Sequence, residues 1–566
     1  MDDKSTKPEE AESVPIDRQQ TLPVYGNGEE NYYDEDWIAP TEDEMATLRR
    51  MGDKIPISAW LVAVVELAER FTYYGLTGPW QNYMQNPRVG LRPGALNLGQ
   101  AKASSLQYFF VFWCYITPIF GAIVADSWLG RYKAICLFSG VYLCGLVVLV
   151  ATSVPSSLDA GAGFGGLIVT MIILGLGTGG IKSNVSPLIA EQYTETRPRV
   201  KVLESGEKVI IDPAVTIQSI YNIFYWCINI GSLSAIATTY LELYIDFWAA
   251  YLLPFCVFFF APLVLWIGKK KYVVRPPKGS ILLDAGNALW IAARNGFRLE
   301  AATDQYGEQF IAELQRALVA CRVFAFYPAF WLLYGQMNTS FVSMAGTMET
   351  HGLPNDFLIN LNPISIIIFI PLVEKGLYPM LRKLGISFKP ITRIFVGFLC
   401  ISLGMAYAAG IQKYVYMQGP CYDHPLECAA SMKGEIPNRA HVALQTPVYV
   451  LTGFGEIFAA ITGLEYAFTK APPSMKSFVT AIYLLQNAFG SAIGIGVSSV
   501  AHNPNMVTFF AALSGVTVVC GFAFFALFRK HNKTEETMNR LDADNEEFKP
   551  RPPAEIQAAK EKISEP

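Results

Sequence analysis

Charged residues are scarce in this chain of 566 residues, at 16% of the sequence, whereas soluble domains average about 25%. Hydrophobic residues make up 52%. They gather in blocks of about twenty, the length at which a helix crosses a hydrocarbon layer about 30 Å thick. The composition therefore argues against a set of soluble domains and predicts an all-α protein embedded in a lipid bilayer.

Features of several other protein classes are also missing. The first apolar block begins only near Ile57, too late and too long for a secretory signal. Lysine and arginine form no basic stripe, so we expect no nucleic-acid partner. The sequence shows no nucleophile beside a base, no metal-ligand cluster and no phosphate-binding loop. We therefore expect neither an enzyme nor a bound cofactor or metal.

Apolar runs bounded by glycine, proline or charge predict twelve membrane-spanning helices in two sets of six. We place them near residues 57–84, 103–125, 133–153, 166–191, 216–240, 244–268, 320–348, 357–381, 391–413, 441–470, 476–500 and 505–528. The first set defines an N-terminal bundle over 57–268 and the second a C-terminal bundle over 320–528. An even number of spans puts both ends of the chain on one side of the membrane.

The segments outside the bundles are polar. Residues 1–56 begin with an acidic stretch without hydrophobic periodicity, which predicts a disordered tail. Residues 269–319 open with KKKYVVRPPKGS and are expected to form a linker, partly as a helix along the membrane surface. Residues 529–566 form a second polar tail.

Lysine and arginine are concentrated in the loops that share a side with the two tails. Such loops generally face the cytoplasm, so we expect a multi-pass protein with both termini cytoplasmic. The plasma membrane is the expected location, with an internal membrane as the alternative. The loop CYDHPLEC then lies outside, where Cys421 and Cys428 could form a short disulfide. The remaining cysteines lie in or beside apolar blocks and are expected to be reduced and inert.

The first span contains three charged residues, Glu66, Glu69 and Arg70, in otherwise apolar sequence. Spacings of three and four place them on one broad helical face. Because charge in a bilayer is costly, this face must line a cavity or meet partner charges. Arg70 can neutralise one carboxylate and leave the other free to take up a proton. The alternative is an ion-pair network that only fixes helix packing.

Two other spans also carry charge. Lys182 follows the glycine cluster GLGTGG and is either part of a site or extended to the membrane surface. Glu456 and Glu465 are nine residues apart in the tenth span, which places them on opposite helical faces. We expect one to face a central cavity and the other to pair with a neighbouring helix. With four carboxylates against two cations, such a site suits a proton and a zwitterion.

These charges lie within longer motifs. ELAERFTYYG resembles the ExxERFxYYG motif of the proton-dependent oligopeptide transporters, a branch of the major facilitator superfamily. GAIVADSWLGRYK, FYWCINIGSL, FWLLYGQM, LNPISIIIFIPLVEKGLYP and TGLEYAFTKAPPSMKS resemble other segments of the family, in the same order. The resemblance covers nearly the whole stretch from Glu66 to Lys476 and is greatest to fungal members. It implies proton-coupled import of di- and tripeptides by alternating access between two six-helix bundles.

The resemblance also implies roles for single residues. It assigns proton coupling to Glu66, Glu69 and Arg70. For the peptide, it implies contact with Tyr74 and Tyr115, backbone ligands in Asn229 and Asn362, a side-chain pocket wall in Trp331 and an ammonium partner in Glu465. It implies that Lys182 interacts either with the peptide carboxylate or with the Glu66 network.

Three positions depart from the family pattern. Thr77 occupies a position where many members have an arginine that binds the peptide carboxylate. Gly335 replaces an acidic residue of the seventh helix, and Tyr108 stands where animal members have a histidine. Carboxylate recognition and the site of protonation are therefore expected to differ from those of other members.

Three alternative functions compete with peptide import. A relative on the same fold could carry nitrate or another small anion, although a cavity carboxylate would repel it. A receptor could bind peptide without transport, but it would need tails that recruit partners. A membrane-embedded enzyme would need the catalytic groups that the sequence lacks.

Overall fold

The computed structural model describes residues 40–529 except 196, 204–205, 278, 386–387 and 433. The predictions of disordered tails therefore lie largely outside the described residues. The prediction is wrong for residues 40–56. There Thr41 caps α1 (Glu42–Thr47) through a reciprocal hydrogen-bonded pair with Glu44, and β1 (Arg50–Met51) joins a small sheet.

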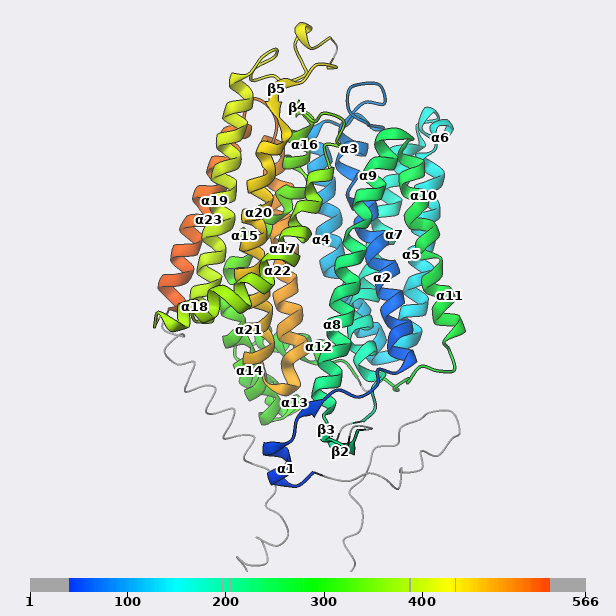
Figure 1. Cartoon of the computed structure of the whole chain (residues 1–566), viewed down its shortest axis with the longest axis vertical. Helices are drawn as coiled ribbons and strands as arrows, with labels where there is room; N and C mark the ends of the chain where they lie inside the picture. The colour runs from blue at the N-terminus through cyan, green and yellow to red at the C-terminus, as the bar shows by residue number, and fades with distance from the viewer. Residues whose placement is uncertain are drawn as a thin grey trace, which may run out of the picture.

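Eleven helical stretches among the described residues are long and apolar enough to cross a membrane. The first predicted span, α2 (Ile57–Thr77), has 21 residues but also carries Glu66, Glu69 and Arg70. The eleven stretches and α2 together give twelve membrane-spanning segments in two bundles (Figure 1). The predicted fold class is confirmed.

Helices of the N-terminal bundle are broken by short turns, so most spans consist of one or two segments. After α2 they are α3 (Trp80–Gln85), α4 (Gln100–Val124), η1 (Ala125–Leu129), α5 (Arg131–Ser153), α6 (Pro155–Asp159), α7 (Ala162–Glu191), α8 (Pro213–Ser232), α9 (Ser234–Tyr244), α10 (Phe247–Phe258) and α11 (Phe260–Ile267).

The C-terminal bundle is built in the same way, and several of its spans change helix type midway. Its segments are η3 (Arg322–Phe326), α15 (Tyr327–Tyr334), η4 (Gly335–Asn338), α16 (Ser340–Gly346), η5 (Phe357–Asn360), α17 (Leu361–Leu372), η6 (Val373–Leu377), α18 (Tyr378–Lys383), α19 (Pro390–Met417), η8 (Val442–Gln445), α20 (Thr446–Gly455), η9 (Glu456–Ile461), α21 (Thr462–Lys470), α22 (Lys476–Val497), η11 (Ser498–Val500) and α23 (Met506–Phe528).

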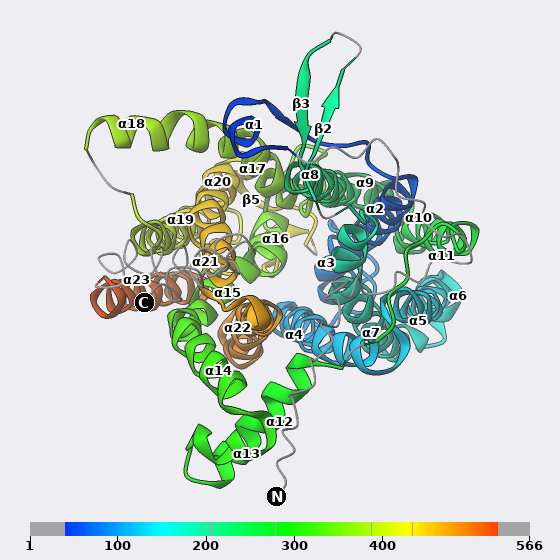
Figure 2. The ribbon, with the colours of Figure 1, turned by 90° about the horizontal axis from the view of Figure 1, so that it is seen from below.

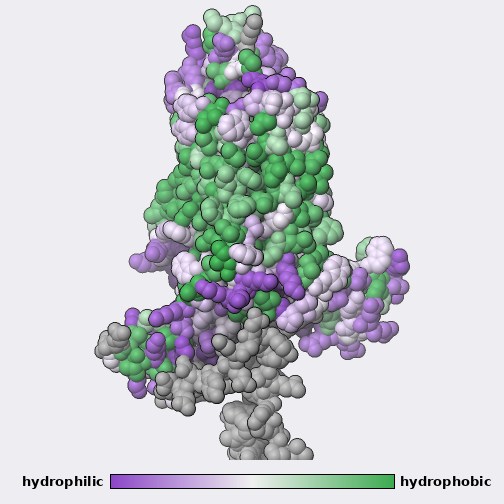
Figure 3. Space-filling model, turned by 90° about the vertical axis from the view of Figure 1, so that its right-hand side faces the viewer, coloured by the Kyte–Doolittle hydropathy of each residue, from purple (hydrophilic) through white to green (hydrophobic). Residues whose placement is uncertain are grey.

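The two ends of the molecule differ, and we name each by one feature. At the disulfide end, β4 (Met348–Glu349) pairs with β5 (Asn438–His441) beside the loop in which Cys421 and Cys428 are joined (Figure 1). The α1 end carries α1, the small sheet and the linker. A hydrophobic belt lies between two hydrophilic ends (Figure 3), as expected of a protein that spans a bilayer.

A three-stranded sheet at the α1 end was not predicted. β2 (Arg199–Val202) and β3 (Lys208–Ile211) form an antiparallel hairpin between the fourth and fifth spans. β1 adds to β3 in parallel, and Arg199 forms an ion pair with Asp53 at 2.8 Å. This pairing of a strand before the first span with a distant loop has no short-range sequence signal.

The linker between the bundles is helical. It contains α12 (Ile281–Arg294), η2 (Leu299–Ala302), α13 (Thr303–Tyr306) and α14 (Glu308–Cys321), which continues through η3 into α15. These helices extend to the side of the bundles at the α1 end (Figures 1 and 2). Ser280 caps α12 by accepting a hydrogen bond from the Leu283 amide.

The two bundles are joined by side-chain hydrogen bonds near the disulfide end. Arg92, in the loop after α3, donates to the carbonyl oxygens of Gly346 and Met348 and to the Thr350 hydroxyl, at 2.7 to 2.9 Å. Gln81 of α3 donates to Ser343 of α16 at 3.2 Å. Seen from the α1 end, α3 and α16 lie between the two groups of helices (Figure 2).

Candidate functional site

The three charges of α2 form one buried network. The Arg70 Nε lies 2.5 Å from Glu69 Oε2 and 3.3 Å from Glu66 Oε1. Glu69 is fully buried, and Glu66 and Arg70 are 3% and 6% exposed. The structure thus brings together the three residues that were predicted to form a proton-coupling network.

A residue of α7 completes this network. The Thr178 hydroxyl donates a hydrogen bond to Glu69 Oε1, while Glu69 Oε2 faces Arg70. Glu69 is therefore held by two groups and Glu66 by one. Thr178 was not predicted, although it lies one helical turn before Lys182 in the glycine cluster.

Helix α8 reaches the network because of a glycine. A Cβ atom at Gly231 would lie 2.7 Å from Arg70 Cβ and 2.8 Å from the Phe71 backbone nitrogen. Any larger residue would push α8 away from α2. Gly231 belongs to FYWCINIGSL, so this motif has a packing role beside Arg70.

Lys182 lies on the same side of the N-terminal bundle. Its Nζ sits over the Tyr115 ring, 4.1 Å from the centroid, a cation–π geometry. Lys182 is half-buried and lies within electrostatic range of Glu66. The structure therefore places Lys182 and Tyr115 together, next to the network, rather than at the membrane surface.

Aromatic residues of α2 extend this surface. Arg70 lies over Tyr73, 5.2 Å from its centroid, and Tyr74 packs edge-on against Tyr73. Tyr74 is within electrostatic range of both Tyr115 and Glu456. Because Glu456 belongs to the other bundle, Tyr74 marks where the two bundles face each other.

In the C-terminal bundle, Glu456 is held by neutral groups. Asn362 of α17 donates to Glu456 Oε2 at 3.0 Å, and the Tyr334 hydroxyl of α15 is a second partner. Tyr334 also lies within electrostatic range of Tyr74 and Tyr115. Asn362, which was predicted to bind substrate, thus orients Glu456, and Tyr334 is a residue that the prediction missed.

The remaining predicted binding residues lie nearby. Trp331 packs edge-on against Tyr334, with 5.4 Å between ring centroids, and its buried Nε1 has no hydrogen-bond partner among the described residues. Asn229 of α8 donates to the Tyr225 carbonyl of its own helix at 2.8 Å. It therefore supports α8 in this conformation.

Glu465 does not join this group. Its side chain is 56% exposed and pairs with Arg393 of α19 at 3.8 Å. The nine-residue spacing had predicted opposite faces for Glu456 and Glu465, and the pairing with a neighbouring helix is found. The choice of Glu465 as the ammonium partner is not supported, because the carboxylate beside the residues from both bundles is Glu456.

Two of the departures from the family pattern are coupled in space. The Tyr108 hydroxyl donates to the Leu332 carbonyl at 3.0 Å and accepts from Gln336 at 2.7 Å. A Cβ atom at Gly335 would lie 2.5 Å from Tyr108 Cε1. The ring of Tyr108 therefore fills the space that a side chain at 335 would need.

The third departure, Thr77, lies apart from these two contacts and donates a hydrogen bond to the Tyr73 carbonyl of its own helix.

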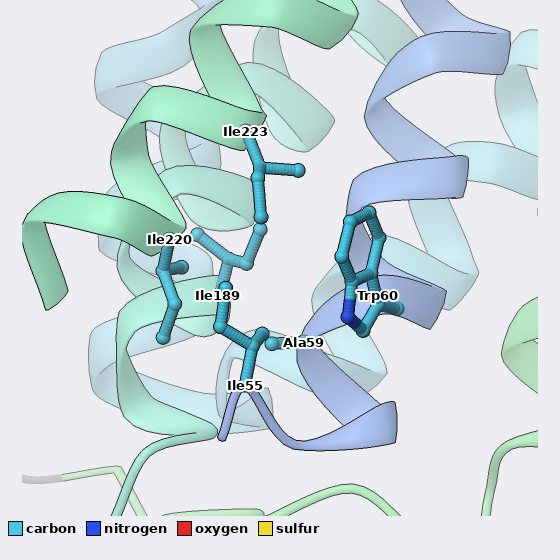
Figure 4. Close-up of a pocket in the computed structure, with 6 residues that line it drawn as sticks. All are labelled: Ile55, Ala59, Trp60, Ile189, Ile220 and Ile223. Atoms are coloured by element: carbon cyan, nitrogen blue, oxygen red, sulfur yellow. The ribbon is translucent and has the colours of Figure 1, made fainter. Parts of the chain in front are cut away.

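A small pocket elsewhere has a different character. It lies where α2, α7 and α8 meet and is lined by apolar side chains: Ile55, Ala59, Trp60, Ile189, Ile220 and Ile223 (Figure 4). It offers no charged group to a ligand. The charged residues between the bundles are therefore the better candidate for a polar ligand.

The arrangement of two six-helix bundles around a charged, aromatic-rich centre defines the fold class of the major facilitator superfamily. The family model described as the POT family matches residues 132–516. The chain belongs to this family.

Fungal proteins are among its relatives. The chain is 50% identical over 517 residues to a peptide transporter, PTR_A, of Candidozyma auris, with 90% of this chain and 87% of the relative covered. It is 47% identical over 522 residues to the peptide transporter PTR2 of Saccharomyces cerevisiae, with 91% and 86% covered.

Solved structures agree on the fold. An auto-inhibited POT family peptide transporter matches with a TM-score of 0.68 at 21% identity, covering 84% of this chain and 97% of the other. The POT family transporter PepTSo matches with a TM-score of 0.67 at 20% identity, covering 85% and 99%.

Proposed function

We propose that this protein is a proton-coupled symporter that imports di- and tripeptides by alternating access. The observation that carries the proposal is a cation on one bundle and a carboxylate on the other, each beside a tyrosine at the place where the bundles face each other. Lys182 lies over Tyr115 in the N-terminal bundle, Glu456 lies beside Tyr334 in the C-terminal bundle, and Tyr334 is within electrostatic range of Tyr115. A short peptide is a zwitterion, with an ammonium at one end and a carboxylate at the other.

Glu456 is the proposed partner of the peptide ammonium. Its two partners, Asn362 and Tyr334, are uncharged, so its negative charge is not balanced by them. A charge-assisted hydrogen bond from an ammonium is shorter and stronger than one between neutral groups. The peptide would supply the cation that this carboxylate lacks.

Lys182 is the proposed partner of the peptide carboxylate. Arg70 already contacts Glu66 and Glu69, whereas Lys182 rests on the face of an uncharged ring. Thr77 supplies no charge and uses its hydroxyl within α2. Lysine is a flexible point charge, which suits peptides of two different lengths.

Proton coupling is proposed for Glu66. Glu69 is held by both Arg70 and Thr178, so both of its oxygens already have a partner. Glu66 Oε1 lies farther from Arg70 Nε, at 3.3 Å, and Glu66 is also within electrostatic range of Lys182. A peptide carboxylate that engages Lys182 would draw this cation away from Glu66 and favour protonation there.

The proposed setting is the plasma membrane, with both termini in the cytoplasm. The lysine and arginine distribution supports this orientation, and it places the Cys421–Cys428 disulfide outside, where such bonds persist. The bundles are hydrogen-bonded near the disulfide end, which corresponds to a conformation closed on the outside.

Uptake into proteoliposomes tests the function. The purified full chain should accumulate a labelled dipeptide when the lumen is alkaline relative to the bath, and a protonophore should abolish accumulation. Protein-free vesicles are the control. A parallel assay measures whether unlabelled nitrate or unlabelled dipeptides reduce uptake of the label. Uptake that ignores the proton gradient would contradict symport, and competition by nitrate but not by dipeptides would favour an anion carrier.

A further inference from the structure

A second pair of carboxyl groups lies between the bundles, at the disulfide end. Glu242 is in the last turn of α9, in the N-terminal bundle, and Asp356 immediately precedes η5, in the C-terminal bundle. The two side chains are 3% and 1% exposed and lie within hydrogen-bond reach of each other. The peptide site described above does not include them.

Two amides hold Glu242 against the C-terminal bundle. Asn82 of α3 donates to Glu242 Oε1 at 2.8 Å and to Asn355 Oδ1 at 2.9 Å. Asn355 donates back to Asn82 Oδ1 at 2.9 Å and to the Val342 carbonyl at 3.1 Å. The carboxyl pair therefore forms part of a buried polar contact that exists only when the bundles meet.

The groups facing the pair are acidic or neutral. Tyr251 of α10 lies within electrostatic range of both carboxyls, and Tyr449 of α20 within range of Asp356. Asp246, which precedes α10, accepts from the Phe247 amide. Arg92 uses its guanidinium on the carbonyls of Gly346 and Met348 and on Thr350.

The oxygens of the pair have few other partners. Apart from the contact between the two groups, no side chain among the described residues donates a hydrogen bond to Glu242 Oε2 or to either oxygen of Asp356. Two ionised carboxylates within hydrogen-bond reach would repel each other in a water-poor environment, and buried charge is costly. A single shared proton removes the repulsion and provides the missing donor, as in other paired carboxylates.

We propose that Glu242 and Asp356 form a proton-binding site that spans the two bundles and stabilises closure at the disulfide end. The proton bridges one carboxyl group and the other carboxylate. When the bundles separate at this end, each group is hydrated and the proton is released. This site is distinct from the Glu66 network, and it does not depend on a peptide.

The direction of the pH effect follows from proton uptake on closing. Burial raises the pKa of Asp356 to about 6, while its hydrogen bond with Glu242 limits the rise. A hydrated carboxyl group titrates near pH 4. The closed conformation thus binds more protons than the open one between these values, so acid favours closure and the stabilisation is lost as pH rises through about 6.

Spin-label distance measurements on the full chain, without peptide, test this site. Labels at Phe164 of α7 and Leu444 of η8 report separation at the disulfide end, because both positions are exposed and lie in different bundles. The cysteines outside the disulfide are replaced first, and this background must retain the melting temperature of the parent chain. We expect the open fraction to rise at least threefold between pH 5.5 and pH 8.

Glu242→Gln supplies the decisive comparison. The glutamine amide at position 242 can donate a hydrogen bond to Asp356 at any pH, so this variant should stay closed at both pH values. Asp356→Asn should stay closed for the same reason. His351→Gln is the matched control, since His351 lies at the same end, is exposed and pairs with Glu349 at 3.8 Å. It should keep the wild-type response.

Three results would overturn the proposal. The first is an open fraction that does not change with pH in the wild type. The second is a wild-type pH response in both Glu242→Gln and Asp356→Asn. The third is closure that follows sodium concentration at fixed pH, which would mean that a metal cation rather than a proton fills the site. None of these depends on whether peptides are the substrate.

Discussion

At the proposed peptide site, the two bundles hold their buried carboxylates in opposite ways. In the N-terminal bundle, Glu66 and Glu69 face Arg70, and Lys182 is nearby, so two negative charges meet two positive ones. In the C-terminal bundle, Glu456 is held by Asn362 and Tyr334, which are neutral. At this site the charges of the N-terminal bundle balance each other, whereas Glu456 has no cationic partner among the described residues.

This difference suggests a different role for each bundle. A balanced network can gain or lose one proton with a modest change in its electrostatic energy, because a cation remains close to whichever carboxylate is ionised. A lone buried carboxylate instead gains most from a cationic ligand, since desolvation without a partner is costly. The first arrangement suits proton coupling and the second suits recognition of an ammonium.

The largest expected effect concerns the balanced network. Glu66→Gln removes a titratable group at little steric cost, so accumulation of dipeptide against its gradient should fall to background, while counterflow without a proton gradient persists. Uptake into proteoliposomes measures both. Glu465→Gln is the matched control, because it removes an exposed carboxylate from the same chain. Accumulation with wild-type pH dependence in Glu66→Gln would remove Glu66 from coupling.

The next effect concerns the lone carboxylate. Hydrogen bonds to charged groups contribute about 1.5–3 kcal/mol, so Glu456→Gln should weaken binding of free dipeptides about tenfold to a hundredfold. N-acetylated dipeptides lack the ammonium and should bind the variant nearly as well as the wild type. Inhibition constants for the two ligands measure the difference, and an equal loss for both would exclude Glu456 from this role.

Much of this comparison was predictable from the sequence. Residues three and four apart on one helix must share a face, so the Glu66, Glu69 and Arg70 network could be predicted from spacing alone. The twelve spans follow from hydrophobic length. Both depend on local geometry, which the order of residues determines.

Contacts between distant segments were harder to predict. Thr178 meets Glu69 only because α7 packs against α2, and β1 pairs with β3 across more than one hundred and fifty residues of chain. The sequence could not decide between Glu456 and Glu465 for a similar reason. Helical spacing showed that they face opposite ways, but which face meets the other bundle depends on how α20 and α21 pack.

A third effect sharpens the contrast at the other end of the peptide. Lys182→Ala should weaken binding of free dipeptides about tenfold, the equivalent of about 1.4 kcal/mol, and spare dipeptide carboxamides, whose C-terminus is neutral. Inhibition constants on the variant decide the matter. If both ligands weaken alike, Lys182 serves the Glu66 network or the packing against Tyr115, and the carboxylate needs another partner.

The smallest effect is expected at Glu465, and it separates the two carboxylates of the tenth span. Glu465 is exposed and pairs with Arg393 at 3.8 Å, and exposed ion pairs contribute about 0–1 kcal/mol. Arg393 also stacks on Tyr378 and donates to the Phe388 carbonyl, so it stays in place when its ion-pair partner is removed. Glu465→Gln should therefore change inhibition constants for free and N-acetylated dipeptides by less than about twofold, in parallel. The opposite result would be weaker binding of free dipeptides, but not of N-acetylated ones, in Glu465→Gln and no such change in Glu456→Gln. It would show that the tenth span presents its other face to the peptide, and it would reverse the comparison between the bundles.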